Sequence, residues 1–449
     1  MTWENKLMRT VRCRNLQNRG TLANLLTAIA DEGGVVGAIQ LIKESSRAVV
    51  RDITIYADDE KQLMSILAVM EENPGTRILE VRDDVLELHR QGKIAIRSRY
   101  TIDDLYTMRR VYTPGVAEVC LKIAEDTKLA RTYTAISHLV AIVTDGTAIL
   151  GLGDIGPVAG MPVMEGKAML MESLVGLSGI PILLNTTDTD EIVDTIANIA
   201  PTFAAIQLED ISAPRCFEIE TRLQARLKIP VMHDDQHGTA VVTIAALTNA
   251  CRQSNMDIKH AVIGQIGLGA AGLATCKMLM SHTGNSVLGA DLSFDALARL
   301  EALGGKPSTL AEIMAQADIV IATTGAPGLI KPEMVQKGQI ILALSNPSPE
   351  ITPDAALRAG AAFAADGTSV NNVLGFPGIL RGAVDAQVPY ISQKMYLAAA
   401  QTIAALANGD ELVPNPLDKE VHQAVARAVA EQAIRDGLCK AEFVTYLED

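Results

Sequence analysis

A glycine-rich turn between two apolar runs constrains the fold of this chain more than any other feature. The turn GLGAAG follows the strand-like run HAVIGQI and precedes LATCKMLM, which has the composition of a helix. In this context glycine allows a tight turn, a close approach of the backbone to a pyrophosphate, and packing of the helix on the strand. We therefore expect a Rossmann-type dinucleotide site at these residues: Gly267, Gly269, Ala270, Ala271 and Gly272.

A carboxylate follows the next predicted strand at the spacing of a ribose ligand. Asp291 ends the run NSVLGAD, about 20 residues after the turn, where it can accept hydrogen bonds from a ribose 2′-hydroxyl. The segment LSFDALA behind it offers no cation for an extra phosphate, which favours NAD over NADP. Further strand-like runs at 317–325, 339–347 and 361–367 predict a doubly wound sheet over roughly 255–375.

A second copy of the glycine pattern occurs at residues 151–156, but its surroundings differ. Asp154 places an anion inside the loop and Pro157 follows immediately. A phosphate-binding loop would not carry that charge, and we expect no helix behind it. This copy is predicted to be a glycine-rich turn near a substrate.

Charge and length exclude several classes of protein. The 449 residues carry a net charge of −14, whereas nucleic acid and anionic membranes require a basic partner surface. The six cysteines form no CxxC pair, and no apolar stretch reaches the roughly 18 residues of a membrane span. We expect a cytoplasmic enzyme with a small-molecule substrate, no nucleic acid partner and no membrane partner.

Residues 8–90 have the pattern of a separate small module. Two runs with apolar residues at helical spacing alternate with four strand-like runs, and the final run RILEVRDDVLELH is expected to be a strand. The order βαββαβ is the ferredoxin-like arrangement. The module resembles an ACT domain, which implies a small-molecule effector near residues 15–20. A purely structural dimerisation module is the alternative.

Two pairs of adjacent acids stand at the ends of apolar runs. Asp234 and Asp235 follow VMH, and Glu209 and Asp210 follow TFAAIQL. If the first pair lies on a strand, its side chains point to opposite faces and serve different partners. Acids that end buried strands lie where α/β folds bind ligands, and three such carboxylates suit Mg²⁺ or Mn²⁺.

Either pair alone is more often a helix cap or a solvated loop. Two pairs at two strand ends favour the metal site. His233 and His237 flank the second pair, but a hard cation prefers oxygen, so neither histidine is assigned to the metal.

Seven motifs together resemble the malic enzyme family. They span about residues 95–390 in the expected order, and they read YTPGVAEVC (112–120), TDGTAILGLGDIG (144–156), VMEGKAMLM (163–171), LEDISAPRCFEIE (208–220), HDDQHGTA (233–240), ALSNP (343–347) and VNNVLGFPGILRGA (370–383). The resemblance implies oxidative decarboxylation of L-malate to pyruvate and CO₂ with reduction of NAD. It also implies that Glu209, Asp210 and Asp235 ligate the metal.

The same resemblance assigns the catalytic groups. Lys167 would remove the proton of the malate hydroxyl, with Asp234 beside it for orientation and proton handling, and Tyr112 would protonate the enolate after CO₂ leaves. A helix N-terminus and a nearby cation would both disfavour the ammonium form of Lys167, which a base requires. Lys167, Asn346 and Asn372 are the substrate-binding candidates, with Asn371 as a neighbour.

The chain departs from the family at one position. Larger members carry an arginine for a malate carboxylate near the TDG turn, where this chain has Thr147 and Ala148. The alternatives left open are the asparagines, a nest of backbone amides, or an arginine at 109, 110 or 381.

The expected architecture is α/β with three domains. They are an ACT-like regulatory domain at 1–90, a catalytic domain that binds malate and metal at 91–236, and a Rossmann-type NAD-binding domain with C-terminal helices at 237–449. A homo-oligomer is the usual state of such enzymes. A malolactic enzyme that releases lactate, and a non-catalytic sensor of organic acids, are the rival interpretations.

Overall fold

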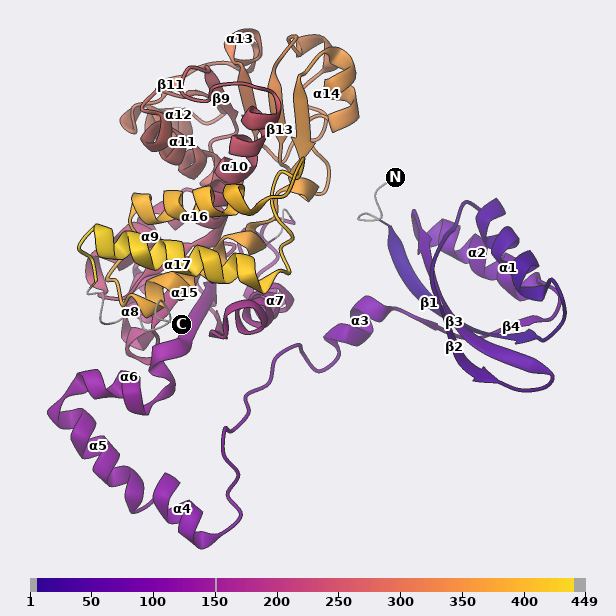
Figure 1. Cartoon of the computed structure of the whole chain (residues 1–449), viewed down its shortest axis with the longest axis horizontal. Helices are drawn as coiled ribbons and strands as arrows, with labels where there is room; N and C mark the ends of the chain where they lie inside the picture. The colour runs from indigo at the N-terminus through magenta and orange to yellow at the C-terminus, as the bar shows by residue number, and fades with distance from the viewer. Residues whose placement is uncertain (1–5, 150–151, 440–449) are drawn as a thin grey trace. The chain divides into compact units, whose positions relative to one another are not determined.

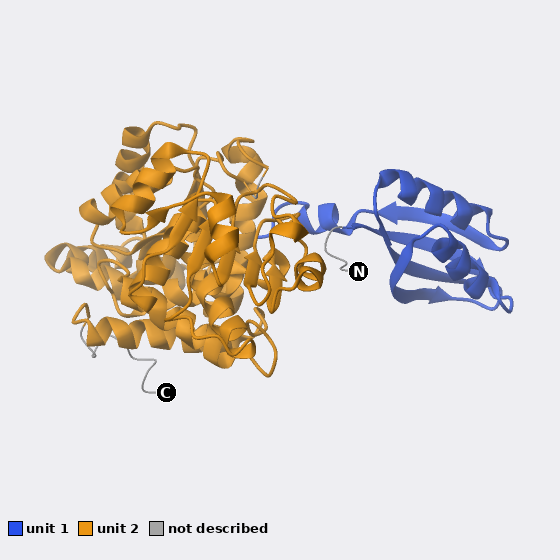
Figure 2. Ribbon diagram, turned by 90° about the horizontal axis from the view of Figure 1, so that it is seen from above, with its two compact units in different colours: residues 1–95 blue, residues 96–449 orange. Residues whose placement is uncertain are grey.

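The computed structural model describes residues 6–149 and 152–439. The chain divides into two compact units, residues 1–95 and 96–449, which are coloured separately in Figure 2. Among the described residues, no helix is long and apolar enough to cross a membrane.

The first unit is a four-stranded antiparallel sheet with two helices packed on it. Its elements are β1 (Leu7–Leu16), α1 (Thr21–Asp31), β2 (Val35–Glu44), β3 (Ala48–Ala57), α2 (Glu60–Glu72), β4 (Thr76–Arg82) and α3 (Asp84–His89). The strand order is β2-β3-β1-β4, and Leu25, Ile29, Ile66 and Met70 bring the helices onto the sheet. The βαββαβ order predicted from the sequence is observed.

The end of this unit differs from the sequence prediction. The run RILEVRDDVLELH is a strand only as far as Arg82, and a short helix follows. Asp83 starts that helix because its side chain accepts a hydrogen bond from the backbone N–H of Leu86. An N-cap of this kind outweighs the apolar alternation of the residues that follow.

The second unit begins with short helices that carry no buried residue. They are α4 (Leu105–Val111), α5 (Gly115–Glu125), η2 (Thr127–Leu129), α6 (Ala130–Tyr133) and η3 (Ala135–His138). In Figure 1 these helices lead from the linker to β5.

A four-stranded parallel sheet follows, with strand order β6-β5-β7-β8. Its elements are β5 (Leu139–Thr144), α7 (Pro157–Val175), β6 (Ser178–Leu183), α8 (Thr189–Ile199), η4 (Ala200–Thr202), β7 (Ala205–Leu208), α9 (Arg215–Arg226) and β8 (Val231–His233). Every residue of β7 and β8 is buried, as the uninterrupted apolar runs of a covered parallel sheet require. The acidic residues that follow these strands therefore lie at the carboxyl edge of the sheet.

The 20-residue helix α10 (Asp234–Gln253) begins directly after β8 and leads to the second parallel sheet. That sheet has the order β11-β10-β9-β12-β13-β14, which is the doubly wound dinucleotide-binding order. Its elements are β9 (Ile263–Ile266), α11 (Ala270–Thr283), β10 (Leu288–Ala290), α12 (Phe294–Ala302), β11 (Lys306–Pro307), α13 (Leu310–Gln316), β12 (Ile319–Ala322), η5 (Pro332–Met334), β13 (Ile340–Ala343), α14 (Pro353–Ala359) and β14 (Phe363–Asp366).

The C-terminal segment returns to the first parallel sheet. It contains η6 (Gly367–Ser369), η7 (Asn372–Leu374), α15 (Phe376–Asp385), α16 (Gln393–Leu406) and α17 (Lys419–Arg435). α15 and α16 both pack on α17, and α16 also packs along α10 (Figure 1). Through these contacts the C-terminal helices join the two parallel sheets into one unit.

Candidate active site

The two acidic pairs lie at the carboxyl edge of the first parallel sheet. Glu209 and Asp210 follow β7 directly. Asp234 and Asp235 do not lie on a strand, since β8 ends at His233 and they are the first two residues of α10. The expectation that strand alternation separates their side chains was therefore wrong. The helix separates them instead, because successive residues on a helix point about 100° apart.

Three carboxylates converge at this edge. Glu209, Asp210 and Asp235 each offer an oxygen, and these oxygens lie within 4.8 Å of one another. Asp210 adopts a left-handed backbone with φ of 53°, and its N–H donates to Asp235 Oδ2 at 3.0 Å. A non-glycine residue in this conformation is held by its surroundings, as is common at functional sites.

These carboxylates fit a divalent cation. Burial raises the pKa of Asp235 to about 6, and the nearby Asp234 adds to the shift. Burial likewise raises the pKa of Glu209, with Asp235 contributing and Lys167 opposing. Glu209 and Asp210 are buried and Asp235 is half-buried, and anions so close together lack sufficient positive charge, which Mg²⁺ or Mn²⁺ with its preference for oxygen would supply.

Lys167 is buried beside this cluster. Its Nζ lies 2.9 Å from Glu209 Oε1, contacts Asp234 Oδ2, and sits 4.6 Å from the centre of the Phe376 ring. The prediction that Lys167 lies at a helix N-terminus is wrong. It lies ten residues after the start of α7 at Pro157, so the helix dipole does not disfavour its ammonium form.

The charge state of Lys167 depends on its carboxylate neighbours. Burial alone would lower the pKa of Lys167, but Asp234 and Glu209 outweigh burial and raise it above its ordinary value. Burial raises the pKa of Asp234 to about 6 against the opposing effect of Lys167. In the absence of a cation the lysine is therefore an ammonium group held by two carboxylates.

Asp234 is fixed by two further contacts. Asn372, in η7, donates from Nδ2 to Asp234 Oδ2 at 2.8 Å. On the other side Asp234 folds back over its own helix, and a Cβ added at Gly238 would collide with its Oδ1. The structure thus brings Asn372 to Lys167 and Asp234, although the two segments are 138 residues apart in the chain.

Tyr112 is not part of this cluster. It ends α4, its side chain is 68% exposed, and it is followed by the turn into α5. The backbone hydrogen bonds of Tyr112 are local: its N–H donates to the carbonyl of Met108 at 2.9 Å, and its carbonyl accepts from the N–H of Val116 in α5 at 2.7 Å. Figure 1 shows α4 and α5 set apart from α7 and α10.

The other residues considered for substrate binding lie in different surroundings. Asn346 follows β13 with an exposed side chain, and Asn371 caps η7 by accepting from the N–H of Val373. Arg381 is already paired with Asp385 at 2.7 Å. Arg109 and Arg110 lie in the last turn of α4, on the segment that carries Tyr112.

An arginine that the sequence analysis did not single out stabilises the TDG turn. Arg215 Nη1 lies 2.8 Å from Asp145 Oδ2, and Arg215 Nη2 donates to Thr147 Oγ1 at 3.0 Å. It also donates to the carbonyl of Thr187 at 2.8 Å. With these partners Arg215 holds three loops together. It lies within the motif LEDISAPRCFEIE, but only the fold brings it to the turn.

The prediction that no helix follows the first glycine pattern is wrong. A helix does follow it, since α7 begins at Pro157 immediately after Gly156. Proline suits the first helical position because its missing N–H has no partner there. Leu150 and Gly151 of this pattern lie outside the described residues.

The second glycine pattern forms the expected turn between β9 and α11. Gly267 has φ of 87°, and a Cβ at Gly272 would collide with the carbonyl oxygen of Gly267. Asp291 lies at the end of β10, where its Oδ2 accepts from the N–H of Leu268 at 2.7 Å. The turn, the helix N-terminus and Asp291 thus form one edge of the sheet, where dinucleotides bind in this fold.

Comparison with known proteins identifies related chains. A family model described as the malic enzyme N-terminal domain matches residues 91–224. NAD-dependent malic enzyme 1 of Bacillus subtilis is 54% identical, over 95% of this chain and 98% of its own. The bifunctional malic/malolactic enzyme of the same organism is 42% identical, over 81% and 95%. The crystal structure of malic enzyme from Pyrococcus horikoshii aligns with a TM-score of 0.75 at 36% identity, over 82% and 96%.

Proposed function

This chain belongs to the malic enzyme family, and we propose that it oxidises and decarboxylates L-malate to pyruvate and CO₂ with NAD as the hydride acceptor. The observation that supports this most directly is the position of Lys167. A buried amine lies between Asp234 and Glu209, beside three converging carboxylates. That arrangement combines a proton-transfer group with a cation site.

The two sets of carboxylates have separate tasks in the proposal. Glu209, Asp210 and Asp235 would hold Mg²⁺ or Mn²⁺. When bound, the ion would polarise the malate hydroxyl and offset the negative charge that keeps Lys167 protonated. Asp234 positions Lys167 and is itself held by Asn372.

Lys167 acts as the base in the oxidation step. It would accept the hydroxyl proton of malate. Bound NAD would supply the acceptor for the hydride on the same carbon, so that the oxidised product is oxaloacetate. Oxaloacetate then loses its distal carboxylate as CO₂, and the electron pair of the broken bond forms an enolate. A proton from Tyr112 converts that enolate to pyruvate. Asn372 lies close enough to the lysine to orient the substrate, and Asn346 is the second candidate.

Tyr112 must reach Lys167 from outside the cluster. Its segment has no buried residue, and it exposes Leu105, Tyr106 and Leu121 by 66% or more. Apolar groups exposed at this level on neighbouring helices indicate a surface that packs against something else. We infer that the protein is a homo-oligomer in which this segment, with Tyr112, packs on the Lys167 site of a second copy.

NAD is the proposed cofactor because of Asp291. Its carboxylate lies at the end of β10 next to the turn of Gly267, Gly269, Ala270, Ala271 and Gly272. A negative charge here favours a free ribose hydroxyl over a phosphate.

The first unit is proposed to be a regulatory ACT-like domain. Its βαββαβ order and strand order β2-β3-β1-β4 support this proposal. We propose three domains at 1–90, 91–236 and 237–449, with the second boundary in the first turn of α10, the helix that leads from one parallel sheet to the other. The ligand of the ACT-like domain would be a small-molecule effector that binds near residues 15–20.

The experiment that tests the function follows the absorbance of reduced nicotinamide when the protein meets L-malate and Mn²⁺, with NAD and NADP in parallel. We expect signal with NAD and pyruvate as the product. Signal with NADP alone would overturn the role of Asp291 but keep the reaction. No product with either cofactor would overturn the proposal.

Malolactic activity is the second candidate, because one relative is named a bifunctional malic/malolactic enzyme. The same residues would serve it, with the cofactor remaining bound. Lactate formation without net NADH would identify it.

A further inference from the structure

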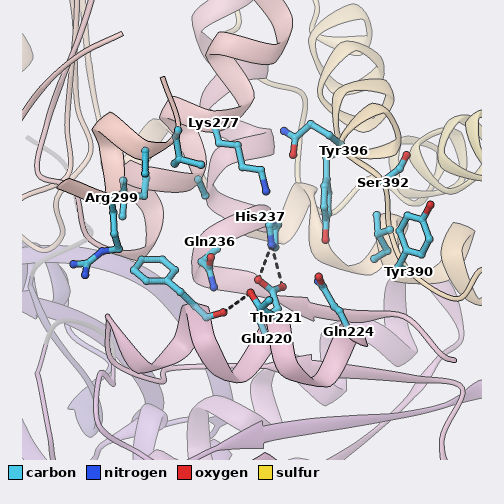
Figure 3. A pocket seen from close by; sticks show the side chains of 17 residues that line it. Glu220, Thr221, Gln224, Gln236, His237, Lys277, Arg299, Tyr390, Ser392 and Tyr396 are labelled. Atoms are coloured by element: carbon cyan, nitrogen blue, oxygen red, sulfur yellow. Dashed lines mark hydrogen bonds and ion pairs between the residues drawn. The ribbon is translucent and has the colours of Figure 1, made fainter. Parts of the chain in front are cut away.

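A cavity of about 570 Å³ lies in the second unit, and Figure 3 shows the side chains that line it. One wall comes from α9 and the first turn of α10, next to the first parallel sheet with its acidic residues (the acidic half). The opposite wall comes from α11 and α12, which pack on the second parallel sheet (the dinucleotide half). Residues 390–396 close one end of the cavity. None of its lining residues belongs to the glycine turn, the three-carboxylate cluster or the Lys167 site.

The lining is rich in hydrogen-bond donors that have no partner. Among the described residues, the buried Tyr396 Oη, Gln236 Nε2 and Arg299 Nε make no hydrogen bond. Lys277 Nζ also has no partner within the described chain, and Figure 3 shows its side chain pointing into the cavity. Burial raises the pKa of Tyr396 well above its ordinary value, so its hydroxyl remains a donor at neutral pH.

The single carboxylate in the lining is already engaged. Glu220 accepts from the backbone N–H of His233 at 2.9 Å, and its other oxygen lies 3.0 Å from His237 Nε2. The remaining charged groups of the lining are the cations Lys277 and Arg299. Phe217, Leu273 and Leu303 add apolar surface. Unpaired buried donors are costly, so a ligand that accepts hydrogen bonds would be favoured here.

We propose that this cavity is an effector site for a small organic anion, in which an acidic group meets Lys277 and Tyr396 and an apolar part meets Phe217 and Leu273. Carboxylate and phosphate groups share the required chemistry, since both accept several charge-assisted hydrogen bonds. The volume suits a ligand of this kind, because small-molecule pockets range from about 300 to 1,000 Å³.

The site is mechanically connected to the acidic cluster. Gln236 and His237 belong to the same helical turn as Asp234 and Asp235. The His237 ring stacks on Tyr396 with centroids 4.5 Å apart and planes within 6°. A ligand drawn against Tyr396 and Gln236 would therefore act on the turn that positions Asp234. Because the two walls come from different halves, a bound ligand also favours one spacing of the halves over others.

The test is calorimetric titration of the full-length protein with NAD and Mn²⁺ at fixed ionic strength. Phenylacetate and phenyl phosphate are the probes, and phenylacetamide is the uncharged counterpart. We expect saturable binding of at least one anion and none of the amide. The tighter of the two anions identifies the acidic group that the site prefers.

Two variants and a matched control locate the site. Lys277→Gln and Tyr396→Phe should each weaken anion binding by about tenfold, because each removes one charge-assisted hydrogen bond. Lys337→Gln makes the same change of charge at an exposed lysine outside the cavity and should leave binding unchanged. Absence of anion binding, or equal binding by all variants, would overturn the proposal.

Coupling to the reaction is measured separately. In the wild-type protein the bound anion should shift the KM for malate by about twofold or more, since coupled sites affect each other reciprocally. Lys277→Gln should keep its turnover without the anion and lose this shift. Binding that leaves the KM unchanged would overturn the role as an effector site. Because binding is measured by heat, it can be judged even if malate is not the substrate.

Discussion

The Lys167 region and the Tyr112 region are built in opposite ways. Lys167 is buried on a 19-residue helix, and carboxylates from two strand ends meet its amine. Tyr112 follows a seven-residue helix whose described contacts include α5, and the residue is 68% exposed. One region is complete within a single chain, whereas the other presents its functional group outward.

This difference indicates how the proposed reaction is divided. Oxidation needs a base fixed beside the substrate, and the buried cluster can provide that geometry without further assembly. The final proton transfer needs a donor that the single chain holds elsewhere. Experiments that separate the two steps therefore test the comparison most directly.

The largest effect is expected from removing either group. Lys167→Ala and Tyr112→Phe should each lower kcat for pyruvate formation by about 1,000-fold, within the range of a lost acid or base. NAD binding, measured by calorimetry, should remain intact in both. The Lys337→Gln variant serves as the control and should retain full turnover. Substantial turnover in either catalytic variant would reject the role given to that residue.

Mixing the two inactive variants tests where Tyr112 acts. If a second copy supplies the tyrosine, an exchanged mixture of Lys167→Ala and Tyr112→Phe chains contains sites with both groups intact. In a dimer, random exchange should restore about a quarter of wild-type activity. Recovery would show that the two regions meet between chains. A mixture as inactive as its parents would show that both residues act within one chain.

A smaller effect is expected at the dinucleotide edge. Asp291→Ser removes the charge next to Leu268 and should raise the KM for NAD by about tenfold while lowering the preference over NADP. The KM for malate should change little, because Asp291 lies on the other sheet. An unchanged cofactor preference would remove Asp291 from the cofactor site.

The smallest effect concerns the stability of the metal-free protein. The pKa of Asp235 is raised to about 6 from an ordinary 3.8, so ionisation of this carboxyl destabilises the folded state. The penalty is absent below about pH 4 and fully present above about pH 6. The shift of about two pKa units corresponds to about 3 kcal/mol. Because 32% of the Asp235 side chain is exposed, solvent screening reduces this, and Asp235→Asn should stabilise the metal-free protein by about 1 kcal/mol at neutral pH. The gain should disappear as the pH falls through this window.

With Mn²⁺ present, the wild type should become more stable than the Asp235→Asn variant. The ion binds the folded wild type and raises its unfolding temperature, whereas the asparagine variant lacks one carboxylate ligand. Denaturation scans with chelator and with Mn²⁺ measure both effects. Equal stabilisation of both proteins by Mn²⁺ would argue against Asp235 as a ligand.

Much of the framework could be predicted from the sequence because the signals are local. Glycine spacing and strand endings placed the turn of Gly267 and the acids Glu209 and Asp210 correctly at sheet edges. The order of elements in the first unit followed from apolar periodicity in the same way. These signals depend on neighbouring residues, and the structure agrees with them.

The wrong predictions for the site concern where one element ends and the next begins, as at the junction between β8 and α10. Asp234 and Asp235 directly follow β8 in the sequence and were predicted to extend that strand, but β8 ends at His233 and α10 begins at Asp234. Element boundaries depend on which backbone hydrogen bonds form, and periodicity gives them only weakly. The position of Lys167 within α7 was misjudged for the same reason.

Other parts of the site depend on long-range packing alone. Asn372 reaches Asp234, Arg215 reaches Asp145, and Tyr396 stacks on His237 only after the sheets and C-terminal helices assemble. No local pattern marks these pairs, so sequence spacing could not predict them.

Gly238 carries no charge and lies one helical turn beyond Asp234, yet the position of that carboxylate depends on it. A methyl group in place of its hydrogen would occupy the space into which Oδ1 of Asp234 folds. The aspartate would then have to turn away from Lys167, although alanine suits a helix better than glycine does. A protein engineer who exchanged this glycine for alanine to strengthen the helix would keep every charged group of the site but lose the contact between Asp234 and Lys167.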